Sequence, residues 1–322
     1  MRATAALHLG LQHTAESRAA LVSLLRDRDQ LVQRRAIEAL VRSGLHPAIA
    51  PPFDPVADVL PLLASPDRHV RYAARQLLRR VDRNGWRDAA MALPMPAAID
   101  AQVVLAQTAG VSTDIPPMLD RQLALIKAGP KGADLIGLLR AMHLSIIHAG
   151  GVKHTARYTA IGSALLETFP TGTPQVDREI ARTLAFFETP GAVPKIVTAM
   201  TAPGVHREDQ LFFMYCLRAM KGGWEQPQRA AVVKWFLTAQ DQRWRGGASF
   251  PGYMRDMWNE FLTVLPADER KTAEEEMDVY TPPVQLTSSG RPQQLGDNAN
   301  RLSIQEMREY LMLDPMDYTG DA

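Results

Sequence analysis

The chain has 322 residues, of which 46% are hydrophobic and 22% are charged, and its formal net charge is +1. This composition is enough for a sizeable core, and it excludes a whole-molecule field that would draw the chain onto nucleic acid or an anionic membrane. Cys216 is the single cysteine, which excludes an intrachain disulfide, a cysteine-based zinc cluster and a covalent haem site. No run approaches the roughly 18 apolar residues of a membrane helix, and we identify no signal peptide.

The first 85 residues contain a repeat with a spacing of 38 residues. The positions Leu24-Leu25, Asp29, Val32, Ala36 and Leu40 recur as Leu62-Leu63, Asp67, Val70, Ala74 and Leu78. Such a period is typical of stacked helical repeats. In the second copy the apolar residues recur every three or four positions, which predicts one buried stripe of a helix. Asp29 and Asp67 are the predicted N-terminal caps of the two helices.

The N-terminal residues predict that the chain begins in the middle of such a unit. Arg2-Ala3, Ala6-Leu7 and Gly10 match Arg35-Ala36, Ala39-Leu40 and, within one residue, Gly44. This pattern predicts a second helix with no first helix ahead of it and no polar cap of the kind that normally ends a repeat array. We therefore expect the chain to be a fragment, or a gene product cut from a longer array.

Beyond Trp86 the pattern stays helical but becomes irregular, and no run shows the period-two alternation of a strand. We expect an irregular helical-repeat region over 86–279, a polar linker over 280–300, and a short terminal helix and tail over 301–322. The predicted fold class is all-α, an α-solenoid of the HEAT or armadillo kind. The predicted helices after the repeats span 98–109, 117–128, 133–148, 154–168, 175–188, 191–201, 207–221, 227–240, 250–264 and 267–278.

Catalytic and metal-binding patterns are weak. His143, His148 and His154 lie within twelve residues, but their spacing does not place them on one helix face and no carboxylate lies among them. The sequence contains no HExxH, GxSxG, Walker A or GxGxxG motif. Cys216 lies in an apolar helical run and is interpreted as a packed small hydrophobe. We expect no catalytic residue, no cofactor and no metal in this chain.

An unusual segment spans 222–261 and holds four of the five tryptophans. Trp235 and Phe236 fit a helix core. Trp244 lies between two arginines just before a glycine pair, and tryptophan and arginine are enriched in interface hot spots. Plain packing remains an alternative for this segment. The candidate interface consists of Trp224, Arg229, Arg243, Trp244, Arg245, Phe250 and Tyr253.

The repeats also carry a group of arginines that has two interpretations. One is a solvated face with local ion pairs to Asp27, Glu38, Asp67 or Asp82. The other is a basic ridge for an anionic partner, although the near-zero net charge disfavours nucleic acid. The group comprises Arg34, Arg35, Arg68, Arg71, Arg75, Arg79 and Arg80.

The Leu-Leu-x-x-x-Asp-x-x-Val-x-x-x-Ala pattern of residues 1–85 resembles HEAT repeats of the short bacterial kind. A second resemblance rests on segments that occur in the same order along the chain, at 177–185, 208–210, 223–229 and 246–250, and on Trp235. These are similar to the helical-repeat region of large bacterial extracytoplasmic proteins that join a sugar-dehydrogenase-like propeller, a repeat array and a C-terminal c-type cytochrome domain. The closing segment 301–307 resembles the helix that precedes the haem domain. Leu302 stands where that family has an aromatic residue, and the CxxCH motif is absent.

The resemblance implies an architecture and a periplasmic setting, and it transfers no catalytic or haem-ligating residue. Haem would belong to a neighbouring domain and not to this chain. We expect a non-enzymatic scaffold that binds a protein partner or a neighbouring domain, as part of a larger electron-transfer protein. The alternatives are a HEAT-type lyase or DNA glycosylase, supported by fold analogy alone, and a nucleic-acid-binding solenoid that uses the N-terminal arginines.

Overall fold

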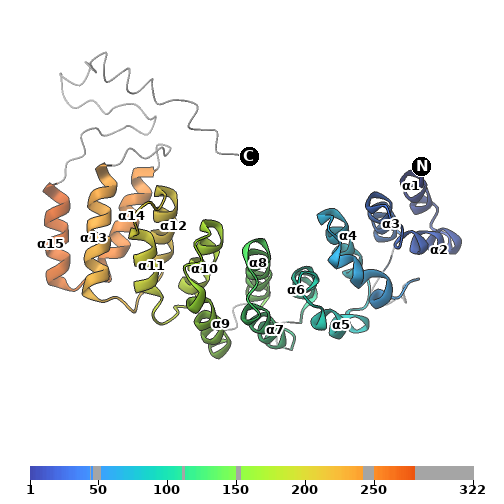
Figure 1. Cartoon of the computed structure of the whole chain (residues 1–322), viewed down its shortest axis with the longest axis horizontal. Coiled ribbons are helices and arrows are strands. Elements are labelled where there is room, and N and C mark those ends of the chain that lie inside the picture. The colour runs from blue at the N-terminus through green and yellow to red at the C-terminus, as the bar shows by residue number, and fades with distance from the viewer. Residues whose placement is uncertain (44, 46–51, 111–112, 150–153, 242–249, 280–322) are drawn as a thin grey trace, which may run out of the picture. The chain divides into compact units, whose positions relative to one another are not determined.

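The computed structural model describes residues 1–43, 45, 52–110, 113–149, 154–241 and 250–279 (Figure 1). Within these residues the regular structure is helical and contains no strand, so the prediction of an all-α chain is confirmed. The chain divides into two compact units, Met1–Gly223 and Trp224–Ala322. The division predicted between residues 85 and 86, and the linker and terminal helix predicted beyond residue 279, stay predictions.

The predicted repeats form the first part of the first unit. The carboxylate of Asp29 accepts the N–H of Leu31 at 2.9 Å, and that of Asp67 accepts the N–H of His69 at 2.6 Å. Both predicted caps are therefore confirmed, and each satisfies a backbone donor that the helix itself leaves unpaired. The elements are α1 (Arg2–Gln12), α2 (Ala15–Leu24), α3 (Gln30–Arg42), η1 (Pro55–Val59), η2 (Leu60–Ala64) and α4 (Arg68–Leu78).

The first helix of the second repeat is not a regular α-helix. It consists of a π-helical turn, η1, followed by a 3₁₀ turn, η2. Pro61 lies where the two meet and lacks the N–H that an α-helix would use, so the hydrogen-bond pattern changes at this point. Leu62 and Leu63 are buried nevertheless, which preserves the apolar contact that the repeat predicts.

The remaining helices of the first unit agree with the predicted ranges to within a few residues. Only the short elements η3 and α5 have no counterpart among the predictions. The elements are η3 (Arg83–Gly85), α5 (Arg87–Ala92), α6 (Ala97–Thr108), α7 (Ile115–Lys127), α8 (Gly132–His148), α9 (Thr155–Thr168), α10 (Pro174–Phe186), α11 (Ala192–Thr201) and α12 (Arg207–Leu217).

Contacts within the first unit arrange its helices in two rows. In the first row α1, α3, α4, α6, α8, α10 and α12 each pack against the next. The second row consists of α2, η2, α5, α7, α9 and α11, and each of these packs against the first-row helix that follows it in the sequence. Figure 1 shows α4, α6, α8 and α10 on one side and α5, α7 and α9 on the other. Each first-row helix is therefore held by the helices before and after it.

Small residues allow close packing in both rows. A Cβ atom on Gly10 of α1 would lie 2.6 Å from the Cβ of Ala39 on α3, and a Cβ on Gly162 of α9 would lie 2.3 Å from the Oγ1 of Thr189. Neither position has room for a larger residue. The predicted stripe from Val70 to Leu78 on α4 is buried, as expected.

One buried polar group links three helices of the first unit. Gln122 of α7 is fully buried, and its side-chain nitrogen donates to Oε1 of Gln102 at 3.1 Å and to Oγ of Ser145 at 2.9 Å. Gln102 belongs to α6 and Ser145 to α8. These hydrogen bonds offset the cost of removing the amide nitrogen from water, whereas Oε1 of Gln122 accepts no hydrogen bond from the described residues. The two bonds join α6, α7 and α8 at defined positions.

The second unit is built from α13 (Gln226–Asp241), α14 (Phe250–Leu262) and α15 (Ala267–Val279). Its core is aromatic: the ring of Phe236 lies 5.0 Å from that of Trp235 and 5.1 Å from that of Trp258. The prediction that Trp235 and Phe236 are core residues is confirmed. No helix among the residues that the structure describes is long and apolar enough to cross a membrane.

Candidate interaction surface

Two residues of the predicted 222–261 interface make contacts inside the second unit. The ring of Trp224 lies 5.4 Å from that of Phe261, edge to face. Arg229 of α13 donates from Nε and Nη2 to both carboxylate oxygens of Glu269 on α15, each at 2.7 Å, and from Nη1 to the carbonyl of Trp224. This bidentate pair lowers the pKa of Glu269, chiefly through the hydrogen bond from Arg229. Both residues therefore have a packing role, which is the alternative that the sequence left open for this segment.

Of the other predicted interface residues, the structure describes only one side chain. Tyr253 of α14 is 63% exposed and is the one side chain of the set that the structure places at the surface. Arg243, Trp244 and Arg245 lie outside the described residues, and so does the side chain of Phe250, the first residue of α14. The interface at this segment stays a prediction.

The N-terminal arginines lie on α3, on α4 and in the turn that follows α4, and several are paired with carboxylates. Arg34 and Arg35 both bind Glu38, at 2.7 and 2.8 Å. Arg71 and Arg75 both bind Asp100 of α6, at 2.8 and 3.2 Å. The predicted local ion pairs are confirmed for Arg34 and Arg35, whereas Arg71 and Arg75 pair with a carboxylate of the next first-row helix that was not among the predicted partners. Arg68, Arg79 and Arg80 are exposed.

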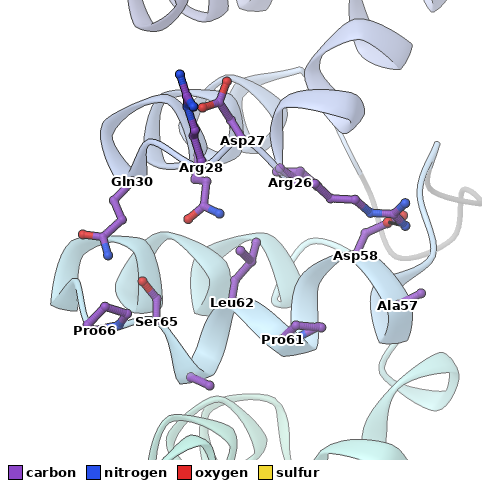
Figure 2. A pocket seen from close by; sticks show the side chains of 13 residues that line it. Arg26, Asp27, Arg28, Gln30, Ala57, Asp58, Pro61, Leu62, Ser65 and Pro66 are labelled. Atoms are coloured by element: carbon purple, nitrogen blue, oxygen red, sulfur yellow. Dashed lines mark hydrogen bonds and ion pairs between the residues drawn. The ribbon is translucent and has the colours of Figure 1, made fainter.

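A hollow of about 380 Å³ lies between the turn that follows α2 and the η1–η2 segment (Figure 2). Its two lining carboxylates are already paired: Asp58 with Arg26 at 2.6 Å and Asp27 with Arg2 at 2.8 Å. In Figure 2 the Arg26 side chain extends to Asp58 at one end of the hollow. No aromatic residue lines it. The lyase or glycosylase alternative requires a carboxylate beside aromatic residues, and this hollow does not combine them.

A more distinctive group of side chains lies on α10 and α12 of the first row. Phe186 and Tyr215 are 61% and 53% exposed, which is unusual for large apolar side chains. Arg178, Arg182 and Phe186 follow one another at intervals of four residues, so they share one face of α10. We call the following residues the α10–α12 patch: Arg178, Arg182, Phe186, Phe212, Tyr215 and Arg218.

Guanidinium groups lie over the aromatic rings of this patch. The guanidinium carbons of Arg182 and Arg178 lie 5.2 and 5.9 Å from the ring centre of Phe212. That of Arg218 lies 4.6 Å from the ring centre of Tyr215. These distances are within the range of cation–π attraction. The patch thus combines positive charge with exposed ring surface.

Two buried carboxylates hold the arginines of α10 in place. Asp209 of α12 accepts from Nε of Arg178 at 2.5 Å. Glu179 accepts from Nη1 of Arg182 at 3.0 Å and also lies 3.6 Å from Arg140 of α8. Three arginines, Arg140, Arg178 and Arg182, share these two carboxylates, so positive charges outnumber negative ones in this group. The guanidinium groups are fixed before any ligand arrives.

Sequence reasoning missed the α10–α12 patch. It interpreted the run from Leu211 to Leu217 as a buried apolar face around Cys216. One signal was present: this run is apolar on every side of the helix, and a helix packed in a row cannot bury all of its sides. Tyr215 points to the side that stays exposed.

The predicted non-functional residues occupy the positions expected of packed side chains. Cys216 is buried, and burial raises the pKa of its thiol to about 12. His143 lies against α10, with its Nε2 atom 2.9 Å from Oγ1 of Thr183. Burial lowers the pKa of His143. Within the described part of the chain, no three His, Cys, Asp or Glu side chains come together in a way that would hold a metal ion.

Comparisons with known proteins identify no relative of this chain. No protein-family model matches the chain, and neither the curated proteins nor the solved structures that were searched give a match.

Proposed function

We propose that the chain is a non-enzymatic scaffold of helical repeats that binds a protein partner through the exposed side of its first row of helices. The α10–α12 patch is the observation that carries this proposal. Exposed aromatic rings and arginines are the side chains most enriched in interface hot spots. Here they lie on helices that neighbouring helices hold in place, and such rigid support favours precise binding.

The finer architecture is part of the same proposal. The first row, in which each helix packs on the next, and the 38-residue repeat both support a superhelix of the HEAT or armadillo kind. Arrays of this kind offer long surfaces built from successive repeats. A nucleic-acid partner is less well supported, because Glu38 and Asp100 each pair with two of the N-terminal arginines and reduce their positive charge.

The sequence resemblance supplies a setting for this scaffold. We propose that it lies beside a c-type cytochrome domain in an extracytoplasmic electron-transfer protein, and that its partner is a neighbouring domain there. Support for this setting comes from the resemblance alone. Reading the genomic DNA on either side of the coding region tests it: a CxxCH-coding segment immediately downstream is the expected result, and flanking genes unrelated to haem proteins would contradict it.

Photo-crosslinking tests the binding role. A photoreactive amino acid replaces Phe186 or Tyr215 in the full chain expressed in its own host, and Ser163 on α9 of the second row serves as the control position. All three positions are exposed. We expect Phe186 and Tyr215 to give the same crosslinked protein and Ser163 to give none. Equal crosslinking at all three positions, or no crosslink at the first two, would contradict the proposal.

A further inference from the structure

We propose that the α10–α12 patch binds an acidic protein segment that also carries aromatic or other large apolar side chains. This inference rests on the proposed function and names the chemistry of the partner. It follows from three properties of the patch: its charge, the geometry of its arginines and its exposed rings.

The charge of the patch selects carboxylates. Arg178 and Arg182 of the patch, together with Arg140 beside it, outnumber the two carboxylates that lie among them, Glu179 and Asp209. Each guanidinium has five N–H donors, and the hydrogen bonds of Arg178 to Asp209 and of Arg182 to Glu179 each use one of them. Arginine presents its donors in a planar fork that fits a carboxylate with two parallel hydrogen bonds. The side chain of a Glu or Asp residue therefore matches this site.

The geometry of the arginines reduces the cost of binding. A free arginine side chain loses much rotational freedom when it binds a ligand. Arg178 and Arg182 are already held between a buried carboxylate and the ring of Phe212. Their ordering takes place during folding, so less binding energy is lost when a carboxylate docks.

The exposed rings require an apolar contribution from the partner. Phe186 lies one turn beyond Arg182 on the same face of α10, and Tyr215 lies one turn beyond Phe212 on α12. Ile147 on the neighbouring α8 is also exposed. A purely acidic chain would leave this apolar surface in water. A segment with large apolar side chains between its acidic residues covers both kinds of surface.

A protein segment fits better than a nucleic acid. Aromatic rings and arginines also stack on unpaired bases. However, Glu179 and Asp209 lie among the arginines and would repel a continuous phosphate backbone. A peptide can place its separate carboxylates on the arginines and its apolar groups elsewhere.

Selection from a random-peptide phage library tests the inference without knowledge of the natural partner. The immobilised full chain is the target, and the test variant is the double substitution Arg182→Gln/Tyr215→Ala. The matched control is Arg75→Gln/Tyr72→Ala on α4, where the guanidinium of Arg75 lies 5.6 Å from the centre of an equally exposed tyrosine ring. A second test variant, Phe186→Ser, changes an exposed side chain, so loss of folding does not explain loss of binding.

We expect the selected peptides to be rich in Asp and Glu together with Phe, Tyr, Trp, Leu or Met. In fluorescence anisotropy, Arg182→Gln/Tyr215→Ala should weaken the best peptide about tenfold or more, and Arg75→Gln/Tyr72→Ala less than about twofold. Basic or neutral peptides, unchanged binding to both test variants, or tighter binding of a labelled oligo-dT that the double substitution abolishes would each overturn the inference. If such a failure accompanied specific crosslinks at Tyr215, the scaffold role would stand and only the partner chemistry would be wrong.

Discussion

Substitution of Gly162 by alanine tests the close packing between α9 and the turn after α10. Alanine is favoured over glycine inside a helix by about 1 kcal/mol. The added Cβ would lie 2.3 Å from Oγ1, 3.0 Å from Cγ2 and 3.2 Å from Cβ of Thr189. The two closest contacts are with the branch atoms Oγ1 and Cγ2, and both branches face the new methyl group. Rotation about Cα–Cβ still leaves one branch against it, so the two segments must move apart.

The expected cost follows from these distances. Non-bonded atoms of this kind stay about 3.5 Å apart, so the two segments must separate by roughly 1 Å. Overpacking of a core costs about 1–3 kcal/mol, and this contact belongs at the upper end. After the gain in helix propensity, Gly162→Ala should destabilise the chain by about 2 kcal/mol. For a unit of this size the melting temperature should fall by about 4–8 °C, measured by far-ultraviolet circular dichroism.

A second substitution shows whether Thr189 is the cause. The buried hydroxyl of Thr189 has no hydrogen-bond partner, so Thr189→Ala removes an unsatisfied group together with the atoms that crowd Gly162. Gly162→Ala/Thr189→Ala should therefore be more stable than Gly162→Ala alone, with a coupling of about 1–2 kcal/mol in a double-mutant cycle. A stable Gly162→Ala protein, or additive effects of the two changes, would refute the reasoning.

Three further outcomes are expected. Burial lowers the folded-state pKa of His143 below its ordinary value of 6.5, so its contribution to stability is present above that pH and is lost as the pH falls. In urea unfolding, His143→Gln should therefore lose less stability than the parent chain between about pH 7 and pH 5, and an identical pH dependence of the two would contradict this. Arg229→Gln should destabilise the second unit by about 1–2 kcal/mol, measured by the change in tryptophan fluorescence during unfolding. The exposed Arg255→Gln of α14 is the neutral control, and equal stability of the two variants would contradict a stabilising role of the Arg229–Glu269 ion pair. Cys216 should react with a thiol reagent at mildly alkaline pH only after unfolding, because burial raises its pKa to about 12, and fast labelling of the folded chain would argue against a packed cysteine.

Helix positions were predictable because they depend on local patterns. The spacing of apolar residues on α4 and the aspartates that precede α3 and α4 are visible in the sequence and are confirmed in the structure. The η1–η2 segment and α5 were not predictable in the same way. Proline changes the hydrogen bonding of the first, and the six residues of α5 are too few to show a period.

The candidate surface was less predictable because it depends on which helices become neighbours. Trp224 and Arg229 have the composition of an interface, but the ring and the carboxylate that they contact lie about 40 residues further along the chain. For the α10–α12 patch the opposite is true: its residues do not look like an interface in the sequence, but the structure brings them together at the surface. Arg182 and Phe212 are ordinary in isolation, and only the packing of α10 on α12 places the cation over the ring.

The hydrogen bonds of Gln122 have a consequence for the uniqueness of the native packing. Leucine and alanine contacts tolerate a helix that slides by one turn, since one apolar side chain replaces another. A buried amide does not tolerate such a slide, because its side-chain nitrogen would lose its hydrogen bonds to Gln102 and Ser145. A buried donor without a partner costs about 1–3 kcal/mol. Replacement of Gln122 by leucine would therefore allow α6, α7 and α8 to pack in more than one register. Its effect on the free energy of unfolding would be smaller.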